Sequence, residues 1–138
     1  MDLSELIKRL EASTVGGDPR NLRLIARLGQ PFAPSPIPKG LPRFRKMKQC
    51  FRNAFNAACA DQRLLYVEGV AALGCLCTEH AWNSLDGEHA IDLTWRDAPV
   101  VPVYFGVAIP IMEAAKLFGT NGSCYGPFLC DWAAEKGL

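Results

Sequence analysis

Residues 47–95 read MKQCFRNAFNAACADQRLLYVEGVAALGCLCTEHAWNSLDGEHAIDLTW. The first part, residues 47–60, is rich in alanine and contains no glycine or proline, which predicts a buried helix with Cys50 in its first turn. Three segments rich in branched and aromatic residues follow, separated by Gly74 and by Asp86-Gly87, and the latter pair is typical of a hairpin turn. We therefore expect a helix followed by three antiparallel strands.

The flanking sequence predicts further elements on both sides of this stretch. Residues 1–29 show helical periodicity, whereas residues 30–46 are basic and contain five prolines, which favours an extended strap. We expect an α+β fold in one domain, residues 1–138. Its parts are an N-terminal helical element (1–29), the proline-rich basic strap (30–46), a core in which the Cys50 helix packs on an antiparallel sheet (47–109), and C-terminal helices (110–138).

Composition narrows the classes of function. A chain of 138 residues that is 49% hydrophobic suffices for one core, and a net charge of +1 argues against nucleic acid or an anionic membrane surface as a general partner. The amino-terminal MDLSELIKRLEA is charged, and no run approaches the roughly 20 apolar residues of a membrane span. We expect a cytoplasmic protein whose six cysteines stay free thiols.

Cys50 has the surroundings of a reactive thiol. A thiol attacks an acyl carbon as thiolate, which a helix amino terminus or nearby cations stabilise. Cys50 opens its predicted helix within a basic run made of Lys39, Arg43, Arg45, Lys46, Lys48 and Arg52. A buried helical cysteine beside a solvated basic face fits the same pattern, so this segment alone leaves both interpretations open.

His80 and Asp92 form the second part of the candidate site. Strand alternation places His80 on the same face as Trp82, and the Asp86-Gly87 hairpin brings Asp92 roughly opposite His80. Cross-strand neighbours have Cβ atoms about 5 Å apart, a separation that lets a carboxylate accept an imidazole N–H. A histidine–aspartate pair is therefore expected.

Four short motifs occur in a familiar order. They are Cys50-Phe51, Val67-Glu68-Gly69, His80-Ala81-Trp82 and Asp92-Leu93-Thr94. This order resembles the transglutaminase-like branch of the papain-like cysteine protease superfamily, especially small members that include phage-encoded ones. The resemblance implies that Cys50 is the nucleophile, His80 the general base and acid, and Asp92 the residue that orients His80. Two departures are Phe51, where tryptophan is common, and Leu93, where proline is usual.

The resemblance also implies a chemistry and a location. It predicts thiol-dependent acyl transfer on peptide, isopeptide or glutamine amide bonds of a protein or peptide substrate, through a thioester, without a cofactor and in the host cytoplasm for a phage-encoded protein. Hydrolysis is favoured over transfer because water has ready access to a small site. The oxyanion and substrate-positioning candidates are Gln49, Asn53, Trp82 and Glu68, and a purely structural role stays open for Asn53 and Glu68.

Two other functions compete with catalysis. The basic strap from Lys39 to Arg52 suits an acidic partner, as in a phage-encoded inhibitor that lacks catalytic activity. Zinc is the second alternative, with Cys75, Cys77, His80 and His89 as ligands. A C-x-C pair on a strand differs from the C-x2-4-C turns of most zinc sites, so no metal is expected.

Overall fold

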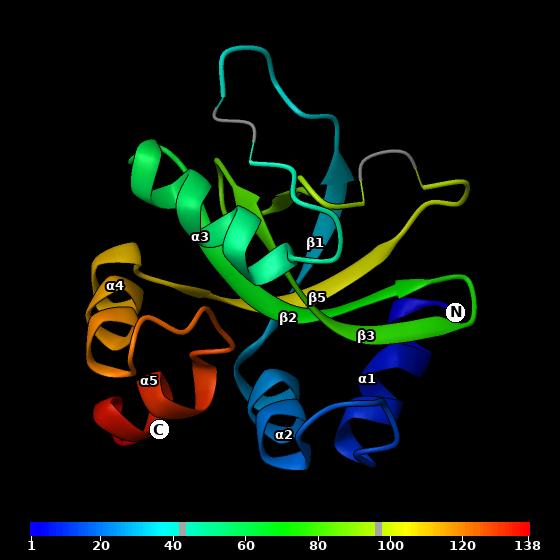
Figure 1. The fold of residues 1–138 in the computed structure, drawn as a ribbon. Coiled ribbons are helices and arrows are strands. Elements are labelled where there is room, and N and C mark those ends of the chain that lie inside the picture. Colours follow the sequence, from blue (N-terminus) through cyan, green and yellow to red (C-terminus); the bar gives the residue numbers. More distant parts are fainter. Residues whose placement is uncertain (42–43, 96–97) are drawn as a thin grey trace.

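The structure is a computed structural model that describes residues 1–41, 44–95 and 98–138. Five helices and five strands lie in these ranges (Figure 1). In chain order they are α1 Leu3–Glu11, α2 Pro19–Leu28, β1 Gln30–Ser35, α3 Cys50–Ala60, β2 Leu65–Leu73, β3 Leu76–Ser84, β4 His89–Ile91, β5 Val103–Ile109, α4 Ile111–Thr120 and α5 Leu129–Lys136. The expected α+β class is therefore confirmed.

The strands form a closed barrel in the order β1-β4-β3-β2-β5, so the expected simple antiparallel sheet is wrong. The β2–β3, β2–β5, β3–β4 and β1–β5 pairs are antiparallel, whereas β1 runs parallel to β4. β1 lies inside the segment that was expected to be an extended strap. It pairs only three of its residues with β5 and three with β4. Such short pairings accommodate Pro31 and Pro34, which a long central strand would not.

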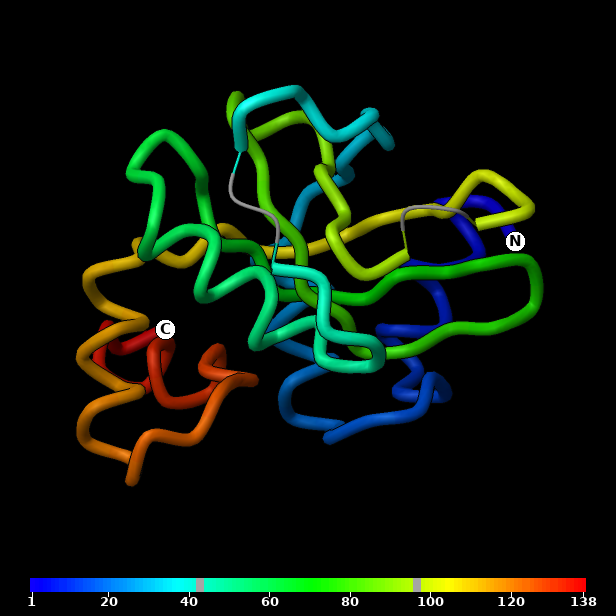
Figure 2. The backbone as a smooth tube through the Cα atoms, turned by 45° about the horizontal axis from the view of Figure 1, so that its top comes forward, coloured from blue at the N-terminus to red at the C-terminus, as the bar shows by residue number. Residues whose placement is uncertain are grey.

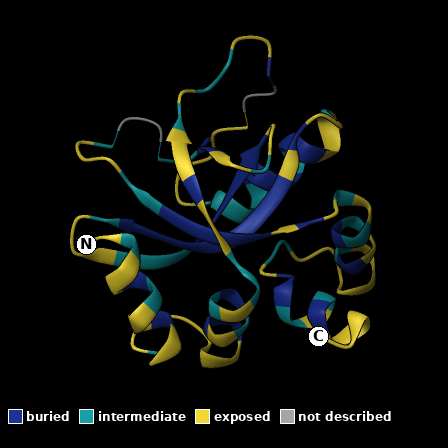
Figure 3. Cartoon of the chain, turned by 180° about the vertical axis from the view of Figure 1, so that it is seen from behind, coloured by how far each residue is buried: buried dark blue, intermediate teal, exposed yellow. Residues whose placement is uncertain are grey.

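The helices pack around the outside of the barrel. α1 and α2 lie on one side of the strands, and α3 packs on β2 and β3 (Figures 1 and 2). Seen from behind, the central strands are largely buried and the helices expose their outer faces (Figure 3). No helix in the described ranges is long and apolar enough to cross a membrane. All six cysteines are free.

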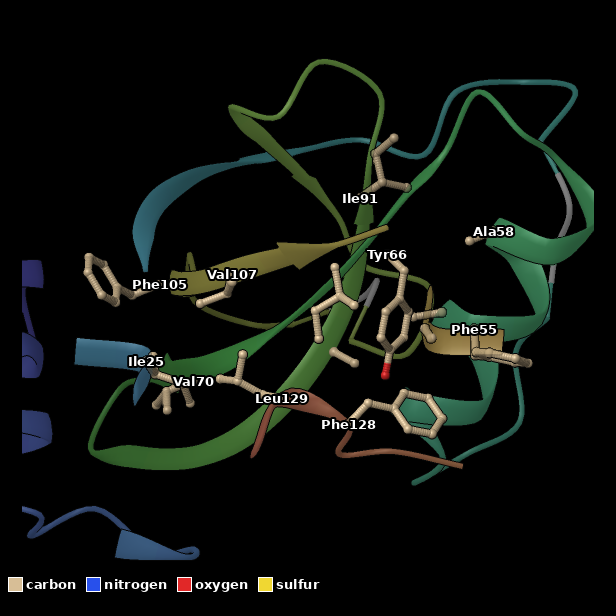
Figure 4. Close-up of a cluster of buried hydrophobic side chains, with 14 of the residues drawn as sticks. Ile25, Phe55, Ala58, Tyr66, Val70, Ile91, Phe105, Val107, Phe128 and Leu129 are labelled. Atoms are coloured by element: carbon tan, nitrogen blue, oxygen red, sulfur yellow. The ribbon is translucent and has the colours of Figure 1, made fainter. Parts of the chain in front are cut away.

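Two apolar clusters cover the two faces of β2. Tyr66 and Val70 face the helices, where Tyr66 meets Phe55 of α3 and Phe128 before α5 at ring distances of 6.1 and 6.0 Å (Figure 4). Val67 points into the barrel, in a cluster with Phe32, Ala71, Trp82, Ala90 and Tyr104. This alternation along β2 means that Glu68 belongs to the helix side and not to the barrel interior.

A glycine contact brings β2 and β5 close together. An added Cβ at Gly69 would lie 2.2 Å from the carbonyl oxygen of Phe105 and 2.4 Å from the Cα of Gly106. Gly69 is also the register partner of His80 on β3. The glycine of the Val-Glu-Gly motif therefore sets the strand spacing directly beside the histidine.

Candidate active site

His80 and Asp92 form a buried pair. Nε2 of His80 lies 2.8 Å from Oδ2 of Asp92, and the two side chains are 2% and 6% exposed. The register pair between β3 and β4 is Asn83 with Ile91, so Asp92 follows the end of β4 rather than lying within the ladder. The expected contact is present, and it is reached by a bend of the chain after β4.

Four donors surround the carboxylate of Asp92. Oδ1 accepts the backbone N–H groups of Thr94 and Trp95, both at 2.9 Å, and Oδ2 accepts the hydroxyl of Tyr104 at 2.7 Å in addition to contacting His80. Burial raises the pKa of Asp92, but the hydrogen bonds and the charge of His80 outweigh burial, so its pKa lies below the ordinary value. Asp92 is thus an oriented anion at neutral pH.

His80 is held between aromatic rings. It stacks on Trp95, with ring centroids 4.1 Å apart and planes inclined by 26°, and it also neighbours Trp82 and Tyr104. Burial lowers the pKa of His80, whereas hydrogen bonds with Asp92 and Cys50 raise it, and the net result is about 9. Because Nε2 faces Asp92, Nδ1 is the nitrogen left for the Cys50 thiol. This arrangement favours a charged imidazolium beside the thiol.

Cys50 is the first residue of α3 and is partly exposed. No side chain in the described ranges caps this end of the helix, and the first intrahelical bond runs from the N–H of Asn53 to the carbonyl of Gln49. The N–H groups of Cys50, Phe51 and Arg52 therefore have no helical acceptor. Together with the helix dipole, these donors favour negative charge next to the sulfur.

Asn53 connects the cysteine helix to the loop that follows Asp92. Its side chain donates to the carbonyl of Lys46 at 2.8 Å and to Oγ1 of Thr94 at 3.0 Å, and it accepts the N–H of Lys46 at 2.8 Å. Asn53 is 1% exposed. Through these contacts Asn53 fixes the position of the Cys50 helix relative to Asp92. Its amide is therefore occupied within the protein and is not presented to a substrate.

Two other predicted positioning residues, Trp82 and Glu68, are buried. Trp82 is fully buried in the barrel, and its Nε1 has no hydrogen-bond partner among the described residues. Glu68 is 1% exposed on the helix side of β2. Its carboxylate accepts the hydroxyl of Tyr66 at 2.6 Å and the N–H groups of Phe128 and Leu129 at the start of α5.

Burial and, to a smaller extent, the charge of Glu79 disfavour the ionised form of Glu68. Burial raises the pKa of Glu68 to about 7, although the hydrogen bonds from Tyr66, Phe128 and Leu129 act in the opposite direction. Glu68 thus anchors the C-terminal helix to the barrel. Gln49 remains at the site, partly exposed at the N-cap of α3, and its Oε1 accepts a long 3.5 Å hydrogen bond from Arg52.

Tyr104 and Trp95 are site residues that the sequence did not single out as such. Tyr104 lies on β5, and Asp92, which its hydroxyl contacts, is twelve residues away in sequence. Trp95 follows the Asp-x-Thr segment and reaches His80 because the N–H groups of residues 94 and 95 turn back onto Asp92. The signal in the sequence that could have identified Trp95 is its position as an aromatic residue three positions after Asp92.

The residues of the zinc alternative are dispersed. His80 contacts Asp92, His89 is exposed and pairs with Asp86 at 2.6 Å, and the Cys77 sulfur lies 3.2 Å from the sulfur of Met1. Within the described ranges, one group of three His, Cys, Asp or Glu side chains lies close enough together to share an ion, namely Asp86, Glu88 and His89 on the surface.

The basic run around α3 is partly described. Lys39, Lys46 and Lys48 are exposed, and Arg52 lies over the ring of Tyr125 at 5.5 Å, whereas Arg43 lies outside the described residues.

Comparison of the chain with protein-family models, curated proteins and solved structures found no match.

Proposed function

We propose that the protein is a thiol-dependent acyl-transfer enzyme, a cysteine peptidase, amidase or transglutaminase-like enzyme, that acts on peptide, isopeptide or glutamine amide bonds. The observation that carries the proposal is the buried chain of interactions from Asp92 through His80 to Cys50. A nucleophile, a base within its reach and a third group that orients the base form the arrangement that nucleophilic catalysis needs.

The proposed reaction has two steps. Cys50 attacks the carbonyl carbon as a thiolate whose proton resides on His80, and a C–S bond forms. The C–N bond then breaks while His80 gives that proton to the leaving amine. Water or an amine then attacks the thioester while the neutral His80 accepts a proton from it. The C–S bond breaks, the product leaves, and the thiolate of Cys50 and the imidazolium of His80 are restored. Asp92 holds His80 in one orientation and stabilises its charged form in both steps.

The amino end of α3 supplies the oxyanion donors in this mechanism. The N–H groups of Cys50 and Phe51 have no helical acceptor and point out of the helix end that carries the sulfur. A preorganised donor of this kind contributes about 3 to 4 kcal/mol to the stabilisation of the transition state. The Gln49 side chain adds a further donor if it turns away from Arg52.

Hydrolysis is the favoured outcome. Cys50 is partly exposed, so water has access to a thioester formed on it. Amine transfer or transglutamination requires a cleft that excludes water from the intermediate.

The proposal is tested by incubating the protein with a diverse mixture of peptides and following each one by mass spectrometry. Cleavage, a one-dalton gain at glutamine and addition of a supplied amine distinguish hydrolysis, deamidation and transfer. The expected activity is lost in Cys50→Ala and in His80→Ala and kept in Cys124→Ala, which removes an exposed thiol. Activity that survives in Cys50→Ala would overturn the proposal.

Binding without catalysis is the second candidate, and the surface before α3 favours it. Met47 and Phe44 are 82% and 39% exposed, and they alternate with the exposed Lys46 and Lys48. A mixed apolar and basic surface suits an acidic protein partner. Under this alternative Cys50→Ala keeps partner binding, whereas Lys46→Glu together with Lys48→Glu abolishes it.

A further inference from the structure

A surface cavity of about 450 Å³ opens beside the proposed site. It is lined by Asp92, Trp95 and Tyr104 and by two proline-rich segments, residues 34–37 after the middle of β1 and residues 98–102 before β5. Its volume lies in the range of roughly 300 to 1,000 Å³ that is typical of ligand pockets. The two segments are far apart in sequence and meet because β1 pairs with both β4 and β5.

The chemistry of the lining is apolar. The segments read Pro-Ser-Pro-Ile and Ala-Pro-Val-Val-Pro, and proline has no backbone N–H to offer a ligand. Val100 and Val101 line the cavity and are 49% and 76% exposed. Among the lining residues that the structure describes, Asp92 is the one that carries a charge, and its two oxygens already have four hydrogen-bond partners within the protein. The cavity therefore suits an uncharged apolar group.

The cavity is lined by Asp92 of the proposed triad and by two aromatic residues that contact the triad. Trp95 lines it and also stacks on His80 at 4.1 Å, and Tyr104 lines it and also donates to Asp92. A group bound there contacts the residues that hold His80 in place. Cys50 and His80 are absent from the lining, so the group belongs to a residue that flanks the attacked amide.

We propose that this cavity binds a bulky aliphatic or aromatic side chain of a peptide substrate, at a residue that flanks the amide attacked by Cys50. The inference rests on the proposed acyl-transfer function and specifies its substrate class. Peptides with large apolar side chains near the reactive amide are then preferred over peptides with glycine or charged residues there. Neither glycine nor a charged side chain buries apolar surface against the lining, so neither gains binding free energy from it.

The test compares two alkylating peptides of equal length, iodoacetyl-Leu-Leu-amide and iodoacetyl-Gly-Gly-amide, with iodoacetamide as the reference reagent. Modification of Cys50 is followed by mass spectrometry under pseudo-first-order conditions. In the wild type, the leucine reagent is expected to modify Cys50 about tenfold faster than the glycine reagent, since burial of one large apolar side chain supplies this factor.

Two variants connect this preference to the cavity. Ala98→Trp fills the cavity and Val101→Asp places a charge on its rim, and both should reduce the ratio of the two rates toward one. Ala134→Trp, on the exposed face of α5, is the matched control and should keep the wild-type ratio. Val101 is largely exposed, so Val101→Asp keeps the test valid if Ala98→Trp does not fold.

The outcomes separate the inference from the proposed function. If Cys50 reacts with iodoacetamide no faster than the other thiols, the proposed function fails. If Cys50 is selectively reactive but shows no preference for the leucine reagent, or keeps that preference in both cavity variants, only the apolar subsite is overturned.

Discussion

The hydroxyl of Tyr104 donates a 2.7 Å hydrogen bond to Oδ2 of Asp92, the same oxygen that faces His80. The other oxygen of Asp92 is occupied by two backbone N–H groups. The carboxylate therefore has little freedom to rotate, and the orientation of His80 depends on a tyrosine from β5. Tyr104 is a positioning residue that acts through Asp92.

Tyr104→Phe is expected to destabilise the protein by about 1.5 to 3 kcal/mol at pH 7, since it removes a hydrogen bond to a buried charged group. The folded-state pKa of Asp92 is lowered, so its contribution to stability is present at neutral pH and is lost as the pH falls through that pKa. The cost of the substitution should therefore shrink in acid. Urea unfolding at pH 7 and at successive pH values below 3.8, the ordinary pKa of an aspartate, measures the two costs.

Tyr125→Phe provides the control for this substitution. The Tyr125 hydroxyl donates a long 3.4 Å bond to the amide oxygen of Asn56, which is uncharged. A small, pH-independent change is expected. The role given to Tyr104 would be wrong if Tyr104→Phe cost less than about 0.5 kcal/mol, the usual range of inconsequential surface changes.

Glu68 predicts a second pH dependence of opposite sign. Its pKa is raised by burial to about 7, so its favourable contribution is fully present below the ordinary pKa of about 4.5 and is lost as the pH rises through 7. Between pH 5 and pH 7 the free energy of unfolding should fall by about 2 kcal/mol on this account. Denaturant unfolding across this range measures the decrease.

Glu68→Gln should remove that decrease, because the amide does not titrate. Glu88→Gln changes the same charge at an exposed position and should leave the decrease in place. An identical pH dependence in wild type and Glu68→Gln would show that Glu68 does not carry the effect.

Lys48 adopts a left-handed backbone conformation, with φ of 60°, two residues before the cysteine. This conformation costs a residue with a side chain about 1 to 2 kcal/mol and costs glycine almost nothing. Lys48→Gly should therefore be about 1 kcal/mol more stable than Lys48→Ala, which removes the same charge but keeps a Cβ. Equal thermal stability of the two variants would contradict the conformation found at this position.

Gly69→Ala should destabilise the barrel by about 3 kcal/mol or more, because the new Cβ would meet the backbone of Phe105 and Gly106 rather than a flexible side chain. Gly119→Ala, in α4 with no atom within 4 Å of the added Cβ, is the matched change and should stabilise slightly, by about 0.5 kcal/mol. Thermal or urea unfolding compares the two. Similar small effects at both positions would contradict the close approach of β2 and β5.

Much of the fold could be predicted because its signals are local. The Asp86-Gly87 turn separates β3 from β4, and α3 was expected from its composition, although it begins at Cys50 rather than at residue 47. Closure of the barrel was missed, since prolines argued against a strand at Gln30–Ser35. The pairing of Ala33 with His89 joins residues far apart in sequence, and no local pattern reveals such a pair.

The candidate site likewise has residues that local motifs predict and contacts that only the three-dimensional structure shows. Cys50, His80 and Asp92 each lie in a short motif, and the structure brings their side chains together. Trp82 and Glu68 belong to the motifs themselves and were named as positioning candidates, with a structural role left open for Glu68; Trp82 packs inside the barrel and Glu68 bonds the start of α5. Tyr104 was not recognised as a partner of Asp92, because that contact depends on the bend after β4.

The most direct test of the central claim is the selectivity of alkylation among the six free thiols. The purified protein is treated with iodoacetamide from pH 5 to pH 9, and the modified cysteine is identified by mass spectrometry in wild type and in His80→Ala. Cys50 should react fastest well below the ordinary thiol pKa of about 8.5, and His80→Ala should abolish this low-pH reactivity. Reaction of Cys50 no faster than that of the exposed Cys124 would contradict the proposed catalytic site.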